Sequence, residues 1–481
     1  MSSHRCVYYQ YLCSFAILTA NRPTIVINDL PDNAFVEIFS ICRMHEISRA
    51  TWGYRTWKWH RLAHVCRTWR HILFASSRHL HLEHVCTNGT PVKKNLGYLQ
   101  AFPIVVSFLD DHFGDNDKDN IIAALQHRDR VQAIEMKVPH SVFEELSTAM
   151  QEPLPVLTHL RLISYPFAAM PVIPDTFLSG HAPRLQTIFI AGISFPDAPT
   201  LLSSTRDLVN VTLHDIPSSG FIPPEAMVAG LAALSKLESL TLGYQWGVSY
   251  HGRIRLPPIT RAVLPALTKF SFDGLFEYFE DFIGQIDAPQ LNNLHITYLD
   301  EDASIDYQIP QLCEFVDRSE KLNLSRFRHA HLTAEPMIAT VELLDGFQSS
   351  FRLTIHEGAI GLVVNQLSAL FTDVDRLFID SSGEIFTMCI YIRWPEFFRP
   401  FTAVKALSID DEISPDILHA LQSITSERTT GVLPVLNLLR IKSGFELMES
   451  TKTFVAARQN VGRPVTIVSS DTEFQERLHI G

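Results

Sequence analysis

The segment LPVLTHLRL, residues 154–162, contains the pattern that most of this chain repeats, and LPVLNLLRI, residues 433–441, has the same spacing. Its apolar anchors Leu157, Leu160 and Leu162 stand at positions i, i+3 and i+5. Successive side chains of a strand point to opposite faces, so Leu160 and Leu162 share one face and Arg161 lies on the other. The segment therefore predicts a short strand with one buried face.

The same spacing recurs along the chain at separations of about 21 to 36 residues, which is the L-x-x-L-x-L signature of a leucine-rich repeat at its long, irregular end. The copies are Val131-Ile134-Met136, Leu157-Leu160-Leu162, Leu185-Ile188-Ile190, Leu208-Val211-Leu213, Leu237-Leu240-Leu242, Leu267-Phe270-Phe272, Leu291-Leu294-Ile296, Phe327-Ala330-Leu332, Gln348-Phe351-Leu353, Val374-Leu377-Ile379, Val404-Leu407-Ile409 and Leu436-Leu439-Ile441.

Proline marks the register of this repeat. It stands two residues before the first anchor in five copies, at Pro155, Pro183, Pro265, Pro289 and Pro434. Proline has a fixed φ and no N–H donor, so it suits the entry to a strand and not its middle.

Helical apolar spacing fills the intervals at 224–234, 276–286 and 361–371. Alternating strands and helices predict an α/β fold with parallel strands and helical crossovers. A (β/α)₈ barrel alternates in the same way, but the copies exceed eight and vary in length. We therefore expect an irregular leucine-rich-repeat solenoid over 75–470, with strands on the concave face and helices and loops on the convex face.

The segment 24–74 has a different pattern, that of two amphipathic helices. Pro31 suits an opening helical position, and apolar residues then follow at helical spacing from Ala34 to Cys42. A second helix is expected from Trp59 to Leu73. Two such helices hold too little core to stand alone, so they must pack on each other, on the rest of the chain or on a partner.

Three parts of this segment, Leu30-Pro31-Asp32, Val36-Glu37-Ile38-Phe39 and Val65-Cys66-Arg67-Thr68-Trp69-Arg70, together resemble an F-box. With the repeats after it, the layout resembles the F-box proteins with leucine-rich-like repeats that are numerous in mushroom-forming fungi. The resemblance implies docking on the Skp-type adaptor, and through it on cullin. The residues implied to bind the adaptor are Leu30, Pro31, Val36, Ile38, Phe39, Leu62, Val65, Cys66 and Trp69.

Two features depart from the F-box pattern. Asn33 stands where the family usually has an acidic residue, and the segment 43–58 is longer and more aromatic than a minimal linker. The alternative interpretation is that Leu30, Ile38, Phe39 and Trp69 are simply the core of an N-terminal helical cap.

Composition limits the class of protein. The 481 residues are 46% hydrophobic and 19% charged, which is typical of a folded chain, and the net charge of −12 argues against general nucleic-acid binding. Seven scattered cysteines indicate a reducing compartment, so we expect a cytoplasmic or nuclear protein. Residues 1–23 are expected to be a disordered leader, with a signal peptide as the alternative. No apolar run is long enough to predict a membrane span.

Motifs for catalysis are missing from the sequence. Neither a P-loop, a nucleophile elbow nor an H-E-x-x-H zinc motif occurs. The segment 115–119 begins like a calcium loop but lacks the glycine and the final glutamate, so we expect a solvated loop there. We expect no metal site, no cofactor and no catalysis by this chain.

Residues between the anchors would form the concave binding face of the repeats. One acid, Glu135, stands at the inner positions of this face against the basic set Arg161, Lys269, His295, His331, Arg352, Arg376 and Arg440. We expect a mildly basic surface for an acidic or phosphorylated segment of a target protein. The alternative is that these are solvated residues without a special role.

The combined expectation is a substrate-receptor subunit of a Skp-cullin-F-box ubiquitin ligase, with a leader at 1–23, an F-box-like domain at 24–74, the repeats at 75–470 and a tail at 471–481. Two alternatives remain open: a repeat-built binding scaffold that does not engage a ligase, and an enzyme on an irregular α/β scaffold.

Overall fold

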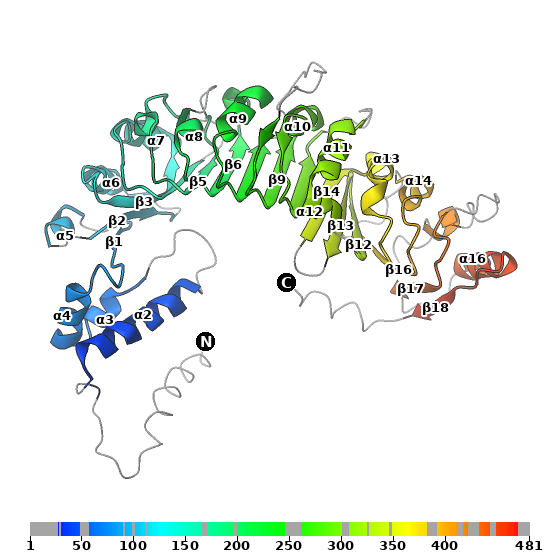
Figure 1. Ribbon diagram of the computed structural model, residues 1–481, viewed down its shortest axis with the longest axis horizontal. Coiled ribbons are helices and arrows are strands. Elements are labelled where there is room, and N and C mark those ends of the chain that lie inside the picture. The colour runs from blue at the N-terminus through cyan, green and yellow to red at the C-terminus, as the bar shows by residue number, and fades with distance from the viewer. Residues whose placement is uncertain are drawn as a thin grey trace, which may run out of the picture. The chain divides into compact units, whose positions relative to one another are not determined.

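The computed structural model describes residues 27, 30–48, 57–89, 92–98, 102–110, 113–114, 116–165, 171–195, 200–245, 261–300, 307–324, 327–345, 349–381, 392–410, 417–421, 432–442 and 449–469. The chain divides into two compact units, Met1–Val85 with Asn95–Val105, and Cys86–Lys94 with Val106–Gly481. We call them the helical unit and the sheet unit (Figure 1). The helical unit extends past the boundary expected at residue 74. The expected leader and tail lie outside the described residues.

The helical unit contains α2 (Asp32–Ser48), α3 (His60–Ala63) and α4 (Arg67–Ala75). The prediction of a single second helix is wrong, because Cys66 interrupts it with an extended backbone at φ −155° and ψ 174°. Its sulfur accepts a hydrogen bond from the Trp69 amide at 3.4 Å and so caps α4. Arg70 Nε donates to the Ala63 carbonyl at 2.9 Å and satisfies the end of α3.

Aromatic residues form the core of the helical unit. The Phe39 ring centroid lies 5.2 Å from that of Trp69, and Phe35 lies 5.7 Å from the same indole. Trp57, from the aromatic segment 43–58, and Trp59, which follows that segment, are also buried in this core. The described part of the segment 43–58 therefore supplies a core residue.

The strands of the main sheet are β1 (His84–Cys86), β2 (Ile104–Phe108), β3 (Val131–Pro139), β4 (His159–Tyr165), β5 (Thr187–Ala191), β6 (Asn210–Ile216), β7 (Ser239–Tyr244), β9 (Lys269–Gly274), β11 (Asn293–Tyr298), β12 (His329–Glu335), β13 (Ile338–Asp345), β14 (Ser349–His356), β15 (Arg376–Ser381), β16 (Ala406–Asp410), β17 (Leu438–Lys442) and β18 (Thr466–Ser469). A separate pair joins β8 (Ala262–Val263) and β10 (Ile286–Asp287).

The remaining α-helices whose bounds lie in the described residues are α5 (Val92–Tyr98), α6 (Asp117–Leu125), α7 (His140–Ala149), α8 (Thr200–Ser204), α9 (Pro224–Leu231), α10 (Phe276–Ile283), α11 (Pro310–Arg318), α12 (Glu320–Leu324), α13 (Glu357–Gln366), α14 (Trp394–Phe398) and α16 (Glu449–Asn460). Short 3₁₀ turns lie at η2 (Phe177–Gly180), η3 (Ser218–Gly220) and η4 (Ser368–Leu370). No helix in the described ranges is both long enough and apolar enough to cross a membrane.

The main sheet is mostly parallel, in the order β1-β2-β3-β4-β5-β6-β7-β9-β11-β14-β13-β12-β15-β16-β17-β18. This confirms the expected α/β class with parallel strands. Among the described strands, β1 and β18 stand at opposite ends of the order and do not pair. The sheet is therefore open, and the closed-barrel alternative does not hold.

The repeated anchors have a consistent place in the sheet. In the copy at 157–162, Leu157 lies two residues before β4, and Leu160 and Leu162 are buried within it. The preceding proline lies in a turn: the Leu157 amide donates to the Leu154 carbonyl at 3.1 Å across Pro155. The other four prolines lie in turns with the same bond. Proline favours the second position of such turns, so it turns the chain just before the strand begins.

An antiparallel meander interrupts the parallel sheet. Strand β13 pairs antiparallel with both β12 and β14, while β14 lies parallel to β11 and β12 lies parallel to β15. The expected copies at 327–332 and 348–353 are indeed strands, although Gln348 itself lies outside the described residues. The sequence reasoning missed β13, which lies between them in the sheet.

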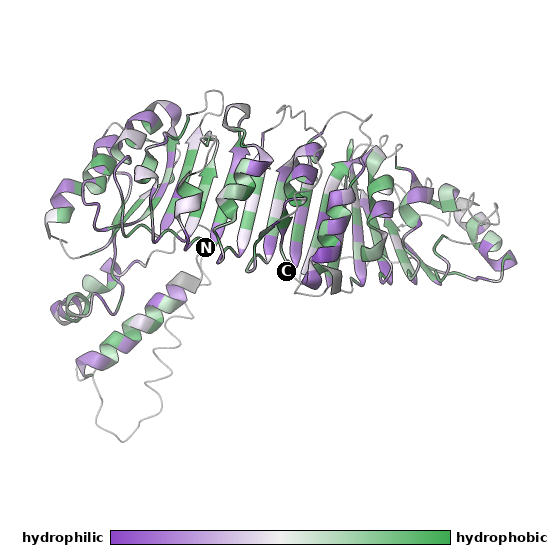
Figure 2. Cartoon of the chain, turned by 45° about the horizontal axis from the view of Figure 1, so that its top comes forward, coloured by the Kyte–Doolittle hydropathy of each residue, from purple (hydrophilic) through white to green (hydrophobic). Residues whose placement is uncertain are grey.

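Helices of the sheet unit lie along one face of its sheet, as α7, α9, α10 and α13 show (Figure 1). Hydrophobic and hydrophilic residues alternate along the strands (Figure 2), and in β4 every second residue is buried. The opposite face, which carries Arg161 and Phe189, has no described helix of this unit over it, and we call it the open face.

Candidate protein-binding surfaces

The residues implied to bind an adaptor differ in exposure within the helical unit. Phe39 is fully buried, and Cys66 acts as the helix cap described above. Four others are partly buried against the core: Leu30, Val36, Leu62 and Trp69. The exposed members are Pro31, Ile38 and Val65, of which Val65 is 57% exposed.

An apolar row on α2 extends the exposed set. Ile38, Ile41 and Met44 follow one another at intervals of three residues and are 38%, 67% and 64% exposed. Residues at this spacing are neighbours on a helix surface. The opposite side of α2 carries the buried Phe35 and Phe39. The helix thus has two apolar sides, one in the core and one facing solvent.

Sequence reasoning missed Ile41 and Met44. Their signal was present in the spacing from Ile38, but helical spacing alone does not separate a core stripe from a surface stripe. Only the burial of Phe35 and Phe39 decides which side faces the core. Exposed large apolar side chains that gather in one place indicate a contact surface.

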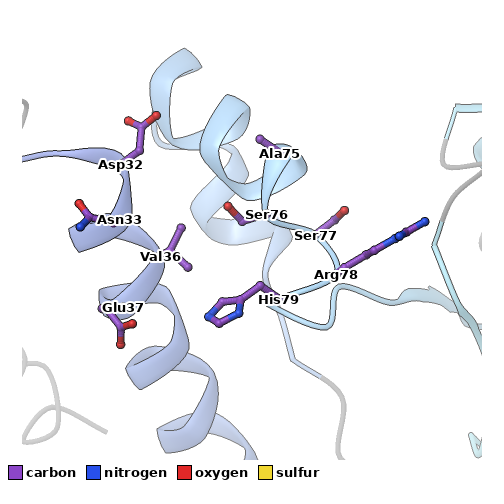
Figure 3. Close-up of a pocket in the computed structure, with 9 residues that line it drawn as sticks. All are labelled: Asp32, Asn33, Val36, Glu37, Ala75, Ser76, Ser77, Arg78 and His79. Atoms are coloured by element: carbon purple, nitrogen blue, oxygen red, sulfur yellow. The ribbon is translucent and has the colours of Figure 1, made fainter.

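A pocket of about 710 Å³ lies between the first turns of α2 and the turn that follows α4 (Figure 3). Val36 and His79 point into it from opposite walls, whereas the Arg78 side chain points away. It is lined by Asp32, Asn33, Val36, Glu37, Ala75, Ser76, Ser77, Arg78 and His79. Asn33, the departure from the F-box pattern, therefore lies beside Val36, a residue implied to bind the adaptor.

On the open face, the strand register brings five of the seven expected target-binding residues into one row. From β4 to β17, residue pairing connects Arg161, Phe189, Thr212, Thr241, Ser271, His295, Arg352, Glu342, His331, Phe378, Ser408 and Arg440. Lys269 and Arg376 lie on the adjacent row, which passes through Asn293, Ser350, Leu344 and His329.

Acidic residues pair with part of this row. Arg352 Nη2 donates to Glu342 Oε1 at 2.8 Å, and His331 Nε2 lies 2.7 Å from Asp380 Oδ2. The expectation of a single acid at the inner positions is wrong, because β13 adds Glu342 to the row.

Histidines add less charge than the sequence suggested. Burial, followed by the charge of Arg352, lowers the pKa of His295, and burial lowers that of His159. Both shifts favour the neutral imidazole over the charged one. His295 Nε2 also lies 3.0 Å from Ser350 Oγ, so it forms part of a polar network within the face.

Asp117 is not part of a solvated loop, which corrects the expectation for 115–119. It is 5% exposed and begins α6. Its carboxylate accepts hydrogen bonds from the Gly89 amide at 3.1 Å and the Gly114 amide at 2.9 Å, and from Asn88. The aspartate therefore fixes loops of the sheet unit. Asp115 lies outside the described residues.

Comparison with known proteins does not assign the chain to a family. No family of known proteins matches it, and no curated protein resembles it at a significant level.

Proposed function

We propose that this protein is the substrate-receptor subunit of a Skp-cullin-F-box ubiquitin ligase, acting in the cytoplasm or nucleus. The helical unit would dock on the Skp-type adaptor, and the sheet unit, as a leucine-rich-repeat-like solenoid, would hold a target protein. The observation that carries the proposal is the exposed apolar row Ile38, Ile41 and Met44, on the helix that also carries the F-box-like motif.

This role requires no catalytic group in the chain. A receptor acts by bringing the target close to the ubiquitin-charged enzyme, which raises its effective concentration near the reactive thioester. No cofactor takes part in this step. The open face, which no described helix of the sheet unit covers, supplies a surface on which such a target could lie.

Capture by a purified Skp-type adaptor tests the proposal. The full chain should bind the immobilised adaptor, and Ile41→Asp with Met44→Asp should abolish binding, because burying two unpaired carboxylates in an interface is costly. Met337→Asp is the matched control, because Met337 is 59% exposed in the sheet unit and should not affect capture. Circular dichroism would establish that all variants are folded.

Failure of the wild-type chain to bind the adaptor would refute the ligase role. Target binding by such a chain would then favour the alternative of a repeat-built scaffold. Binding that survives both α2 substitutions would instead show that the exposed row is not the docking surface.

A further inference from the structure

The solvent-facing side of α2, which we call its outer side, is left uncovered by the described part of the chain. Ile41 and Met44 on this side are 67% and 64% exposed, and Ile27, just before the helix, is 46% exposed. Single apolar side chains on a surface are common, but several on one helix indicate a surface that another segment covers. An occupant is therefore expected even when no adaptor is bound.

Residues 1–26, which lie outside the described part of the chain, contain apolar and aromatic residues with helical spacing. Five of them stand at positions i, i+3, i+4, i+7 and i+10: Tyr8, Tyr11, Leu12, Phe15 and Leu18. This spacing predicts a stripe along one side of a helix. A stripe of this kind needs an apolar surface to pack against, and it stands directly before the helix that exposes one.

The connection to α2 is long enough for this stripe to fold back. Residues 19–31 separate Leu18 from Asp32, the first residue of α2. A chain of that length reaches at most about 45 Å, whereas the 17 residues of α2 span about 25 Å. The stripe can therefore reach the whole outer side. Because it is tethered, its effective concentration at that surface is on the order of millimolar.

Charge also favours this occupant. Residues 1–26 contain Arg5 and Arg22 but no aspartate or glutamate. Asp32 and Glu37 are exposed on the first turns of α2, where they line the pocket shown in Figure 3. Arg22 precedes Asp32 by ten residues, so the tether keeps this cation near the two acids. Opposite charges held within a short distance attract each other, more strongly where water is partly excluded.

We propose that residues 7–18 fold back onto the outer side of α2 and cover Ile38, Ile41 and Met44 until an adaptor displaces them. This inference rests on the proposed function for the adaptor's use of that apolar row, and it names how the row is regulated. The free chain covers its own docking surface. The apparent affinity for the adaptor is then reduced in proportion to the fraction of chains that are uncovered.

Photo-crosslinking of the full chain tests the cover without an adaptor. Photoreactive benzoylphenylalanine takes the place of Ile41, and mass spectrometry identifies the crosslinked peptides. We expect a crosslink within one chain to a peptide from residues 7–18, and its loss when Leu12→Glu and Phe15→Glu are added. The matched control places benzoylphenylalanine at Met337, which is 59% exposed in the sheet unit and should not capture residues 7–18.

Three results of this experiment would overturn the proposal. A crosslink from position 41 that joins two chains would show that a second copy covers the row. Equal capture of residues 7–18 from positions 41 and 337 would show contact without a preferred site. Failure of position 41 to capture residues 7–18 would show that the row has no such cover.

Adaptor affinity provides a second measurement. Leu12→Glu with Phe15→Glu should raise the affinity of the full chain for an immobilised adaptor about tenfold if about nine-tenths of the chains are covered. Gln10→Glu with Ser14→Glu is the matched control, because it adds the same charge away from the stripe and should leave the affinity unchanged. Equal affinities in both double variants and the wild type would refute the cover alone. A chain that forms the crosslink but never binds the adaptor would refute the ligase role and leave the cover standing.

Discussion

The Glu280 carboxylate on α10 caps the neighbouring helix α11, with Oε1 3.0 Å from the amide nitrogen of Leu312. Its Oε2 also accepts a hydrogen bond from the Gln311 amide at 2.9 Å. Glu280 is only 8% exposed. Burial raises the pKa of Glu280 to about 7, against the opposing effect of these two amide hydrogen bonds. One side chain thus joins two successive helices and titrates near neutral pH.

Glu280→Ala should destabilise the sheet unit. The Gln311 and Leu312 amides would lose their acceptor, and each unsatisfied buried donor costs about 1–3 kcal/mol. Glu280→Gln keeps one acceptor oxygen and should cost less. Urea midpoints measure the effect, with Glu277→Ala as the control because Glu277 is exposed on the same helix. Equal midpoints for Glu280→Ala and Glu277→Ala would contradict the capping role.

Stability should also depend on pH through Glu280. Its pKa is about 7 in the fold, above the ordinary value of 4.5, so the folded state favours the protonated carboxyl. The stabilisation from proton uptake is complete below pH 4.5 and is lost as the pH rises through 7. Between these values the slope reaches about 1.4 kcal/mol per pH unit. Between pH 5.5 and 8 the free energy of unfolding should therefore fall less steeply in Glu280→Gln than in the wild type. Parallel curves for the two proteins would argue against this titration.

Phe39 and Ile41 should respond to truncation in different ways. Phe39→Ala removes a fully buried ring beside Trp69 and should cost about 3–5 kcal/mol in the free energy of unfolding. Ile41→Ala removes a side chain that is 67% exposed and should change stability by no more than about 0.5 kcal/mol. Thermal unfolding of both variants distinguishes a core residue from a contact residue. Wild-type stability in Phe39→Ala would mean that the aromatic core of the helical unit is wrongly assigned.

Gly220→Ala should destabilise the sheet unit because the backbone leaves no room for a side chain. A Cβ at Gly220 would lie 2.6 Å from Ser194 Cα and 2.9 Å from Ser194 Cβ. Overpacking of this kind costs about 1–3 kcal/mol. Gly97→Ala is the matched control, since a Cβ there meets no atom within 4 Å and the residue lies in α5. It should stabilise by up to about 1 kcal/mol, as alanine favours helices over glycine. The urea midpoint should fall in Gly220→Ala and rise in Gly97→Ala.

The parallel strands were predictable because their signal is local. Anchors such as Leu160 and Leu162 alternate with polar residues, and they are buried as that alternation requires. Strand β13 also alternates, with Ala339, Val341 and Leu343 buried. What its sequence lacks is the repeat spacing and any indication of which strands it pairs with. Pairing is a non-local property, so the meander could not be inferred from a repeat template.

The charge of the open face was less predictable for the same reason. From the sequence alone, Arg352 was interpreted as an available cation. Its partner Glu342 lies ten residues away in the sequence, so the pairing could not be inferred. The antiparallel register brings them side by side. Replacing Arg352 with glutamate would put two acids opposite each other and disturb the strand pair itself. Arg376 is therefore the cleaner position for testing charge on this face.

The meander also has a consequence for the order of folding. Strand β14 reaches β11 across 55 residues, from Ser350 to His295, whereas β12 and β13 are joined by the short turn at Pro336 and Met337. Local pairings close faster than distant ones. We expect the β12–β13 hairpin to form early, before β15 pairs with β12 and β14 pairs with β13. Until then, both outer edges of the hairpin have unpaired backbone N–H and C=O groups. Those two edges are where a half-folded chain would be most prone to pair with another molecule.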